Sequence, residues 1–455
     1  MRRLFPLLLA LIFVSCSSLT GNQADSPRNV VFFISDGCGP ASFSLAREYQ
    51  RSMSGETKLH LDEHESGSTI THPLEVRVTD SASSATAYAC GIKTLNGRIA
   101  MTADTVAVET ILEKAEAAGF QTALISTARI THATAAAFSS HVDSRSKESE
   151  IALQQIEQGI EILMGGGTQF YTPRESGGRR TDGRDLIAEL ESKGYARADD
   201  RDALMAADSL PLVALFTSSH MAYEIDRDEE MEPSLAEMTS RALSLLDKDD
   251  APFFIMIEAG RIDHAGHGND PAAHLWDIMA YDEAWKAAVD FAHENGETLV
   301  VGTSDHETGG LTLGAEHGGL GGSGYAYDPT KLEPIASSVE AFQSEIAARM
   351  SDGTMTMDWF RESLTSKFNI DFATIASPMT EIMAQAGSDP VTAGRRMQSL
   401  LTGVMSDSAR VGWATGGHTA VNVPIYAFGP GSGAFRGTMD NTEVGMALQD
   451  VLGLR

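Results

Sequence analysis

Three apolar runs in this chain lead directly into residues that could bind a metal ion. They are VVFFIS before Asp36, FFIMIE ending in Glu258, and TLVVGTS before Asp305 and His306. In open α/β sheets, ligands gather outside the carboxyl ends of the strands. A single Asp after a strand is usually a helix N-cap. Several such positions, two of them close to histidines, instead predict one crevice lined by carboxylates and imidazoles.

The stretch RIDHAGHGND adds a metal-ligand spacing to this pattern. Asp263 and His267 are four residues apart, which on a helical turn places both side chains on one face. Mixed carboxylate and imidazole ligands suit zinc better than calcium or magnesium. Asp36 and Glu258, together with a hydroxyl group, would instead form a harder, all-oxygen site that suits magnesium.

A candidate nucleophile lies in VTDSASSATAYACGIKT, residues 78–94. The small residues after Asp80 predict a helix that opens at Ser81. The helix dipole and the free backbone N–H groups at that end favour a serine alkoxide. A zinc ion could lower the pKa of the hydroxyl without an adjacent base. Taken alone, Ser81 would be interpreted as a simple helix cap, as most such serines are.

The elements that would position these groups alternate along the chain. Buried strands are predicted at 30–35, 122–126, 253–258, 298–304 and 423–429, and helices at 105–118 and 234–246. This alternation predicts an α/β fold with a largely parallel central sheet and helices on both faces. Residues 311–410 break the rhythm with a glycine-rich stretch and amphipathic helices near 339–350 and 357–368. We interpret them as an inserted cap or crown.

The charge balance limits the partners of the protein. Among 455 residues, 63 are acidic and 34 basic, which gives a formal net charge of −29. Such a surface repels nucleic acid and anionic membranes. It also repels phosphate esters, so any phosphate chemistry would need a local focus of positive charge from metals or a placed arginine.

The N-terminus has the pattern of an export signal. Arg2 and Arg3 precede the apolar residues 5–14, which are too few to span a bilayer as a mature helix. Cys16 follows in FVSC, which resembles the lipobox of bacterial lipoproteins, although ordinary cleavage after a small residue is the alternative. We expect residues 1–16 to be a signal peptide and 17–28 a tether. This predicts a protein in the periplasm or at the outer membrane, lipid-anchored through Cys16.

The two remaining cysteines, Cys38 and Cys90, do not form a disulfide framework or a CxxC metal pattern. Buried free thiols are favoured. A single bridge stays open in an oxidising compartment.

Five motifs in the same order resemble the alkaline phosphatase family. They are the strand ending in SDG, then DSASSATA, EAGRIDHAGH, TSDHETGG and GGHTA. The resemblance covers residues 29–455 and is weakest in the 311–410 insertion. It implies hydrolysis of small phosphate monoesters through a phosphoserine, with release of inorganic phosphate, and in many relatives a homodimer.

The resemblance also assigns the site residues. It implies that Ser81 is the nucleophile and that Arg145 grips two phosphate oxygens as a bidentate fork. The first zinc would be held by Asp263, His267 and His418. The second zinc would be held by Asp36, Asp305 and His306. The third metal, usually magnesium, would share Asp36 with Thr134 and Glu258.

Two positions vary across the family and bear on the third metal. His132 and His264 stand where the best-known enterobacterial enzyme has aspartate and lysine, and we expect both near the third metal and the phosphate. Zinc or cobalt could therefore replace magnesium there. His274 and His317 match no family ligand, and surface or supporting roles are expected for them.

Two other functions remain to be weighed. Phosphodiesterases and sulfatases share the metal scaffold, but Ser81 lies in DSASS rather than in the Cys/Ser-x-Pro-x-Arg context of sulfatases. A metal-binding lipoprotein without catalysis is the alternative from another class. The complete ligand set and the intact Ser81 argue against it.

Overall fold

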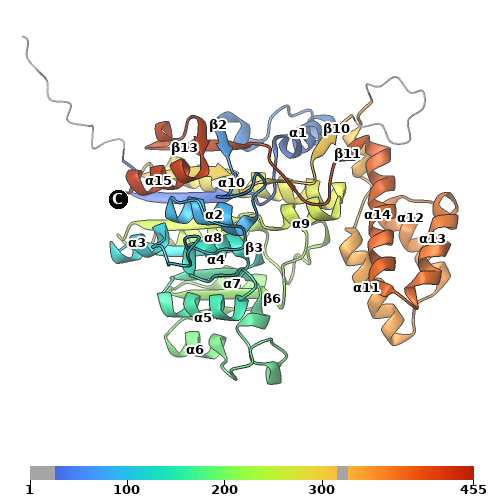
Figure 1. Ribbon diagram of the computed structural model, residues 1–455, viewed down its shortest axis with the longest axis horizontal. Coiled ribbons are helices and arrows are strands. Elements are labelled where there is room, and N and C mark those ends of the chain that lie inside the picture. Colours follow the sequence, from blue (N-terminus) through green and yellow to red (C-terminus); the bar gives the residue numbers. More distant parts are fainter. Residues whose placement is uncertain (1–25, 315–325) are drawn as a thin grey trace, which may run out of the picture.

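The computed structural model describes residues 26–314 and 326–455, and it is built around one ten-stranded sheet (Figure 1). From edge to edge the strands are β14 (Gly437–Asp440), β2 (Glu65–Ile70), β13 (Val423–Phe428), β8 (Thr298–Thr303), β1 (Asn29–Ile34), β7 (Phe253–Glu258), β3 (Gln121–Arg129), β4 (Ile162–Gly166), β6 (Leu212–Thr217) and β5 (Ala196–Ala198). All neighbours pair in parallel except β13, which runs antiparallel to β2 and β8. The predicted α/β class with a largely parallel sheet is confirmed.

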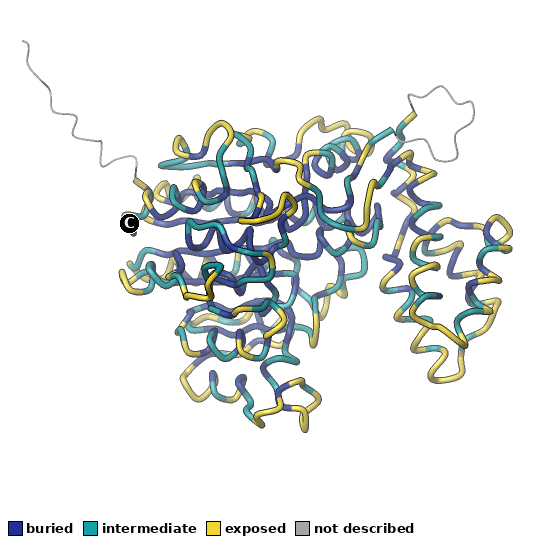
Figure 2. The backbone as a smooth tube through the Cα atoms, viewed as in Figure 1, coloured by how far each residue is buried: buried dark blue, intermediate teal, exposed yellow. Residues whose placement is uncertain are grey.

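The central strands are buried on both faces because their side chains alternate between two cores. In β1, Val31 and Phe33 enter one core cluster, whereas Val30, Phe32 and Ile34 enter the other. Helices cover the sheet on both faces, and the burial map shows its strands enclosed between them (Figure 2). The β-branched and aromatic run predicted this double burial.

Two sets of helices supply these cores. The first core contains residues of α1 (Pro40–Ser54), α7 (Arg201–Ala206), α8 (Leu235–Leu246), α9 (Arg261–Gly268) and α10 (Pro271–Asn295). The second contains residues of α2 (Ser81–Cys90), α3 (Ile111–Ala117), α4 (Ala133–Ser139), α5 (Glu148–Gln158), α6 (Leu186–Ser192) and α15 (Asn441–Val451). The helix predicted at 234–246 is confirmed as α8, which starts after the capping box of Ser234 and Glu237.

The helix predicted at 105–118 was too long at its N-terminal end. Helix α3 begins only at Ile111, because Thr110 and Glu113 form a capping box there. Before it, Met101 and Ala107 form an antiparallel bridge, and Thr105 has φ +63°. The apolar periodicity thus extended into a tight turn closed by the local bridge between Met101 and Ala107.

Cys38 and Cys90 are both buried as free thiols. The expectation of unpaired cysteines is therefore confirmed, and the bridge left open by the sequence does not form. Signal-peptide, tether and Cys16 predictions concern residues outside the described part of the chain. Within the described ranges, no helix is both long and apolar enough to cross a membrane.

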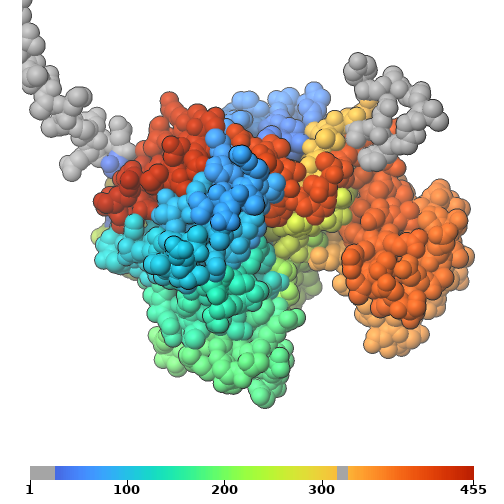
Figure 3. All heavy atoms as spheres, viewed as in Figure 1, coloured from blue at the N-terminus to red at the C-terminus, as the bar shows by residue number. Residues whose placement is uncertain are grey.

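In its described part, the segment between β10 (Leu311–Leu313) and β11 (Val411–Trp413) carries four α-helices at one side of the sheet (Figures 1 and 3). They are α11 (Val339–Asp352), α12 (Met357–Phe368), α13 (Phe372–Ala386) and α14 (Pro390–Ala409). The helices expected near 339–350 and 357–368 match α11 and α12, whereas α13 and α14 had no counterpart in the sequence analysis. The antiparallel β10–β11 pair brings the two ends of the segment together.

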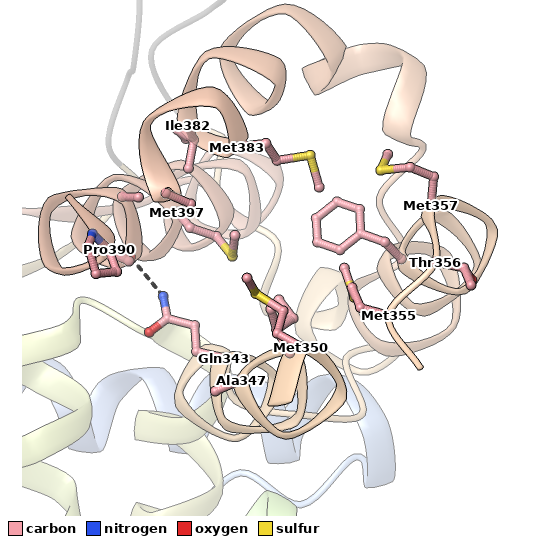
Figure 4. Close-up of a pocket in the computed structure, with 15 residues that line it drawn as sticks. Gln343, Ala347, Met350, Met355, Thr356, Met357, Ile382, Met383, Pro390 and Met397 are labelled. Atoms are coloured by element: carbon pink, nitrogen blue, oxygen red, sulfur yellow. Dashed lines mark hydrogen bonds between the residues drawn. The ribbon is translucent and has the colours of Figure 1, made fainter. Parts of the chain in front are cut away.

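These four helices have a hydrophobic cluster of their own, centred on residues such as Phe342, Phe360 and Leu401. They also enclose a cavity of about 520 Å³. Five methionines are among its lining residues and extend toward its middle (Figure 4): Met350, Met355, Met357, Met383 and Met397. Unbranched, polarizable side chains such as these fill irregular space between helices.

The packing of β8 generates a first prediction. A Cβ at Gly302 would lie 2.7 Å from Trp285 Cζ3 and 2.9 Å from the Tyr281 hydroxyl, both on α10. We expect Gly302→Ala to lower the free energy of unfolding by about 1–3 kcal/mol, because two buried rings must move. The urea midpoint measures this loss. Gly403→Ala in α14, where a Cβ would meet nothing within 4 Å, is the control. Equal midpoints for the two variants would contradict the prediction.

Candidate metal centre and nucleophile

Register across the sheet brings the three predicted carboxylates to one edge. Ile34 of β1 pairs with Glu258 of β7 on one side and with Thr303 of β8 on the other. Asp36 and Asp305 lie two residues beyond these strand ends, and all three carboxylates are fully buried. The prediction that these groups meet in one crevice is borne out by their positions, while their roles remain predictions.

A first cluster joins α9 to the strand β12 (His418–Thr419). His267 Nε2 lies 3.4 Å from Asp263 Oδ2, and His418 Nε2 lies 3.5 Å from Asp263 Oδ1. Each imidazole also places Nδ1 2.8 Å from a backbone carbonyl, that of Gly416 for His267 and that of Thr79 for His418. Since a carbonyl can only accept, both Nδ1 atoms carry the proton and both Nε2 lone pairs are free to bind a cation.

The pairing of β12 with β9 (Glu307–Thr308) is what delivers His418 to this cluster. His418 and His267 are 151 residues apart in sequence, yet their Nε2 atoms are 3.1 Å apart. Burial by itself would raise the pKa of Asp263, but the three imidazoles of His306, His267 and His418 outweigh it and lower that pKa. The carboxylate form of Asp263 is therefore favoured.

A second cluster centres on His306. Its Nε2 lies 3.2 Å from Asp305 Oδ2 and 3.6 Å from Asp36 Oδ1. The Thr308 hydroxyl donates to Asp263 Oδ1 at 2.6 Å, so it must accept from His306 Nδ1, which lies at 3.2 Å. His306 Nε2 consequently presents a lone pair to the two carboxylates.

A third cluster lies deeper, around Asp36 and Glu258. Thr134 Oγ1 donates to Asp36 Oδ2 at 3.3 Å, and Ser126 Oγ donates to Glu258 Oε2 at 2.5 Å. Atoms of Asp36, His132 and Glu258 also lie within 4.8 Å of one another, as a metal site requires. The clusters are adjacent because Asp36 belongs to two of them, and the same criterion groups it with Asp263 and His306.

The electrostatics of these clusters call for cations. Burial and the neighbouring carboxylates raise the pKa of Asp36 well above its usual range. Burial, assisted by Asp263, raises the pKa of Asp305 to about 6. Burial and the charge of Asp305 raise the pKa of Glu258 to about 7, against the hydrogen bond from Ser126. Three carboxylates this close are held ionised only by positive charge among them.

Unpaired ligand atoms agree with that requirement. Among the described residues, four buried atoms of this crevice have no hydrogen-bond partner: Asp36 Oδ1, Asp305 Oδ2, Glu258 Oε1 and His132 Nδ1. Leaving a buried polar atom unpaired costs about 1–3 kcal/mol. Oxygen and imidazole donors left open in this way fit divalent metal ions.

Ser81 is the first residue of α2, and it is not the cap of that helix. Asp80 is the N-cap, with its Oδ1 accepting from Ser83 N at 3.0 Å. The interpretation of Ser81 as a simple cap is therefore wrong. Its hydroxyl is instead 3.2 Å from His306 Nε2, within the second cluster. Because that nitrogen presents a lone pair, the serine is the donor.

Arg145 reaches the same crevice from the loop before α5. Its Nη1 donates to Asp80 Oδ2 at 3.1 Å, and its Nη2 lies 3.1 Å from His132 Nε2. Burial tends to raise the pKa of Asp80, but Arg145 and the N–H groups of Ser83 and Gly97 overcome this and lower it. One carboxylate thus caps the serine helix and orients the arginine.

Three histidine rings form a wall beside Arg145. The ring centroids of His132 and His264 are 5.6 Å apart, and His220 lies 5.4 Å from His132 and 4.2 Å from His264. His220 was missed by the sequence analysis. It stands alone in SSHM after β6, and no spacing connects it with the other two histidines.

The two histidines without family counterparts have different outcomes. His274 is fully buried, with Nδ1 3.1 Å from Ile262 O and Nε2 2.9 Å from Ser42 Oγ. It therefore supports the junction of α9 and α10 rather than the surface. His317 lies outside the described residues.

Comparisons with known proteins agree with the geometry. A family model described as alkaline phosphatase matches residues 27–454. The chain is 36% identical to the repressible alkaline phosphatase of Saccharomyces cerevisiae, over 99% of this chain and 86% of that one. It is 34% identical to alkaline phosphatase 3 of Bacillus subtilis, over 93% and 88%. It superposes on the Thermus thermophilus alkaline phosphatase with TM-score 0.83 and 31% identity, covering 98% and 96%.

The chain belongs to the alkaline phosphatase family, and its activity is that of a phosphomonoesterase. This family is metal-dependent, and the clusters above are the candidate groups for its metals.

The unpaired ligand atoms generate a second prediction. We expect zinc to raise the melting temperature of chelator-treated protein, since zinc at 100 times its Kd stabilises by about 2.7 kcal/mol per site. His418→Gln removes one open Nε2 and should reduce this rise. His60→Gln, at a partly exposed histidine in the 3-10 turn at 60–64, should leave it unchanged. An undiminished rise in His418→Gln, measured by calorimetry, would contradict the assignment of the first cluster.

Proposed function

We propose that this protein hydrolyses phosphate monoesters through a phosphoserine at Ser81, with two zinc ions and a third metal. The observation that carries the proposal is the place of Ser81. Its hydroxyl lies at the start of α2, 3.2 Å from His306 Nε2, beside the carboxylates of the second cluster. A nucleophile at a helix N-terminus next to open metal ligands has the arrangement that phosphoryl transfer needs.

The proposed ligand sets follow the three clusters. Asp263, His267 and His418 would hold the first zinc. Asp36, Asp305 and His306 would hold the second, and Asp36, Thr134 and Glu258 the third metal, usually magnesium. When bound, the zinc ions would supply positive charge that lowers the pKa of the serine hydroxyl and of water and neutralises charge on the leaving oxygen.

The residues of the chain then perform two in-line displacements. Arg145 would exchange its contact with His132 for two oxygens of the phosphoryl group. The hydrogen bond from Arg145 to Asp80 would hold the guanidinium during this exchange. Ser81 Oγ attacks phosphorus, the P–O ester bond breaks, and the alcohol leaves with a proton. Water then attacks the phosphoserine, which releases inorganic phosphate and returns a proton to Ser81. Little acid–base catalysis is needed for such loose transition states.

The third site is where this chain departs from the enterobacterial pattern. His132 is within reach of Asp36 and Glu258, so a nitrogen donor is available to a site otherwise made of oxygen. Zinc or cobalt would accept such a donor more readily than magnesium. Structures of the alkaline phosphatase from the bacterium TAB5 bear on this, because variants with one histidine changed to Glu or Asp are described with Mg bound in the M3 site.

The cellular location and domain organisation are proposed from the N-terminal sequence and the insertion. Residues 1–16 would direct export, with Cys16 lipidated and 17–28 serving as a tether to the membrane. The catalytic domain would be 29–455, with the insertion at 311–410 as a cap. A homodimer is proposed by resemblance alone. Mass spectrometry of the mature N-terminus and light scattering test these points.

Substrate preference distinguishes a phosphomonoesterase from the two alternative functions. A related phosphodiesterase or sulfatase would turn over a diester or a sulfate ester faster than a monoester. A binding protein would contain zinc but hydrolyse none of the three. A substrate panel measured together with metal content therefore distinguishes all of these possibilities.

The nucleophile provides the third prediction. We expect Ser81→Ala to lower kcat for p-nitrophenyl phosphate by at least about 10³-fold, because no covalent phosphoserine can form. Metal content should be unchanged. Ser52→Ala, at an exposed position of α1 whose hydroxyl donates to Glu48 O, is the control. Wild-type turnover by Ser81→Ala would exclude the phosphoserine route.

The third site provides the fourth prediction. We expect His132→Asp to shift metal preference toward magnesium, because a hard carboxylate replaces an imidazole beside Asp36 and Glu258. Stimulation of stripped enzyme by added magnesium, at fixed zinc, should be larger in the variant than in wild type. His141→Asp, outside the crevice and paired with Glu113, serves for comparison. Equal stimulation by magnesium in wild type and His132→Asp would contradict the assignment of His132 to the third site.

A further inference from the structure

Arg261 is a buried cation that the proposed chemistry does not use. It is the first residue of α9, only 3% exposed, and its guanidinium lies 3.7 Å above the ring of Tyr223. Its Nη2 donates to Glu340 Oε1 at 2.5 Å, an ion pair with an acidic side chain of α11 that is itself 58% exposed. Arg261 therefore links the helix of the first cluster to the insertion.

The burial of Arg261 is only partly compensated. Among the described residues its Nε has no hydrogen-bond partner, although the atom is buried. A buried charge with an unpaired N–H lowers stability relative to a well-packed apolar side chain. A gain in stability therefore does not explain why an arginine occupies this position. The remaining contact of the Arg261 guanidinium suggests a different role.

That contact is with His264. Arg261 Nη1 lies 2.9 Å from His264 Nδ1. A guanidinium has donors and no acceptor, so His264 Nδ1 must present its lone pair. The imidazole is then neutral and carries its single proton on Nε2. Within residues 26–314 and 326–455, this Nε2–H has no hydrogen-bond partner of its own.

The His264 ring belongs to the histidine wall that Arg145 contacts through His132. His264 follows Asp263 in sequence, and its ring packs against those of His220 and His132. His132 Nε2 is in turn 3.1 Å from Arg145 Nη2. A neutral N–H donor on this wall can bind an oxygen of the transferring phosphoryl group without adding a charge that would repel the metals.

We propose that Arg261 is a positioning residue, which holds His264 as an Nε2–H donor to the phosphoryl group of the substrate. Glu340 and Tyr223 fix the guanidinium, and the guanidinium fixes the tautomer and orientation of the imidazole. This inference rests on the proposed function, since it assigns a donor for the same phosphoryl group.

The tautomer is tested directly by nuclear magnetic resonance. In holoenzyme with ¹⁵N-labelled histidine, the His264 signals, identified by their loss in His264→Gln, should show a protonated Nε2 and an unprotonated Nδ1. In Arg261→Met the two shifts should move toward an average of the tautomers. A proton on Nδ1 in the wild type, or unchanged shifts in Arg261→Met, would overturn the proposal.

Kinetics test the consequence. We expect Arg261→Met to lower kcat by about 10- to 100-fold, no more than the loss on deleting a donor outright, with little change in KM and in metal content. Arg261→Lys should recover much of kcat, because an ammonium group also donates to Nδ1. Arg349→Met is the matched control, since Arg349 likewise stacks on a ring, that of Trp359, and pairs with Glu345, but lies on the insertion.

An unchanged kcat in Arg261→Met would also overturn the proposal. This failure is distinguishable from failure of the proposed function. If Ser81→Ala stays inactive while the Arg261 variants behave as wild type, only the positioning role is lost. If Ser81→Ala retains turnover, the phosphoserine route fails, while the tautomer measurement still stands.

Discussion

The mutual repulsion of Asp36, Glu258 and Asp305 is the constraint on which this structure depends. Burial raises the pKa of all three carboxylates at the ends of these adjacent parallel strands, and the charge of Asp305 raises the pKa of Asp36 and Glu258 further. Isolated burial of such charges costs far more than a domain can supply. The fold can accommodate these three carboxylates because divalent cations fit among them. Imidazoles of His306, His267 and His418 complete that environment, with lone pairs oriented by bonds to carbonyls and a threonine hydroxyl.

The same constraint explains how an enzyme of net charge −29 can act on anions. A negative surface disfavours phosphate esters everywhere except where positive charge is concentrated. The crevice gathers the N-terminus of α2, Arg145 and the proposed metals around Ser81. Asp80 couples two of these features, because it caps α2 with one oxygen and holds Arg145 with the other. Loss of Asp80 would therefore disturb the proposed nucleophile, Ser81, and the proposed phosphate-binding residue, Arg145, together.

The four-helix insertion is connected to the crevice through both ends of α9. Glu340 pairs with Arg261 at its start, and Gln398 Nε2 donates to Gly268 O at its end. Asp270, just beyond, accepts from Val339 N at the beginning of α11. The helix that carries Asp263, His264 and His267 is thus held by a segment distant in sequence from it. Substitutions in that segment can therefore affect the site without changing any of the proposed metal ligands.

Local patterns in the sequence determined which strands would be buried, which residues would follow them, and that Asp263 and His267 would share a helical face. These features depend on neighbours within a few residues, through side-chain alternation and helical spacing. Tertiary structure decided what depends on distant partners. It brought the Nε2 atoms of His418 and His267 together, paired Arg145 with Asp80, and placed His220 beside His264. Through contacts far apart in the chain, it also set which nitrogen of His267 and of His418 carries the proton.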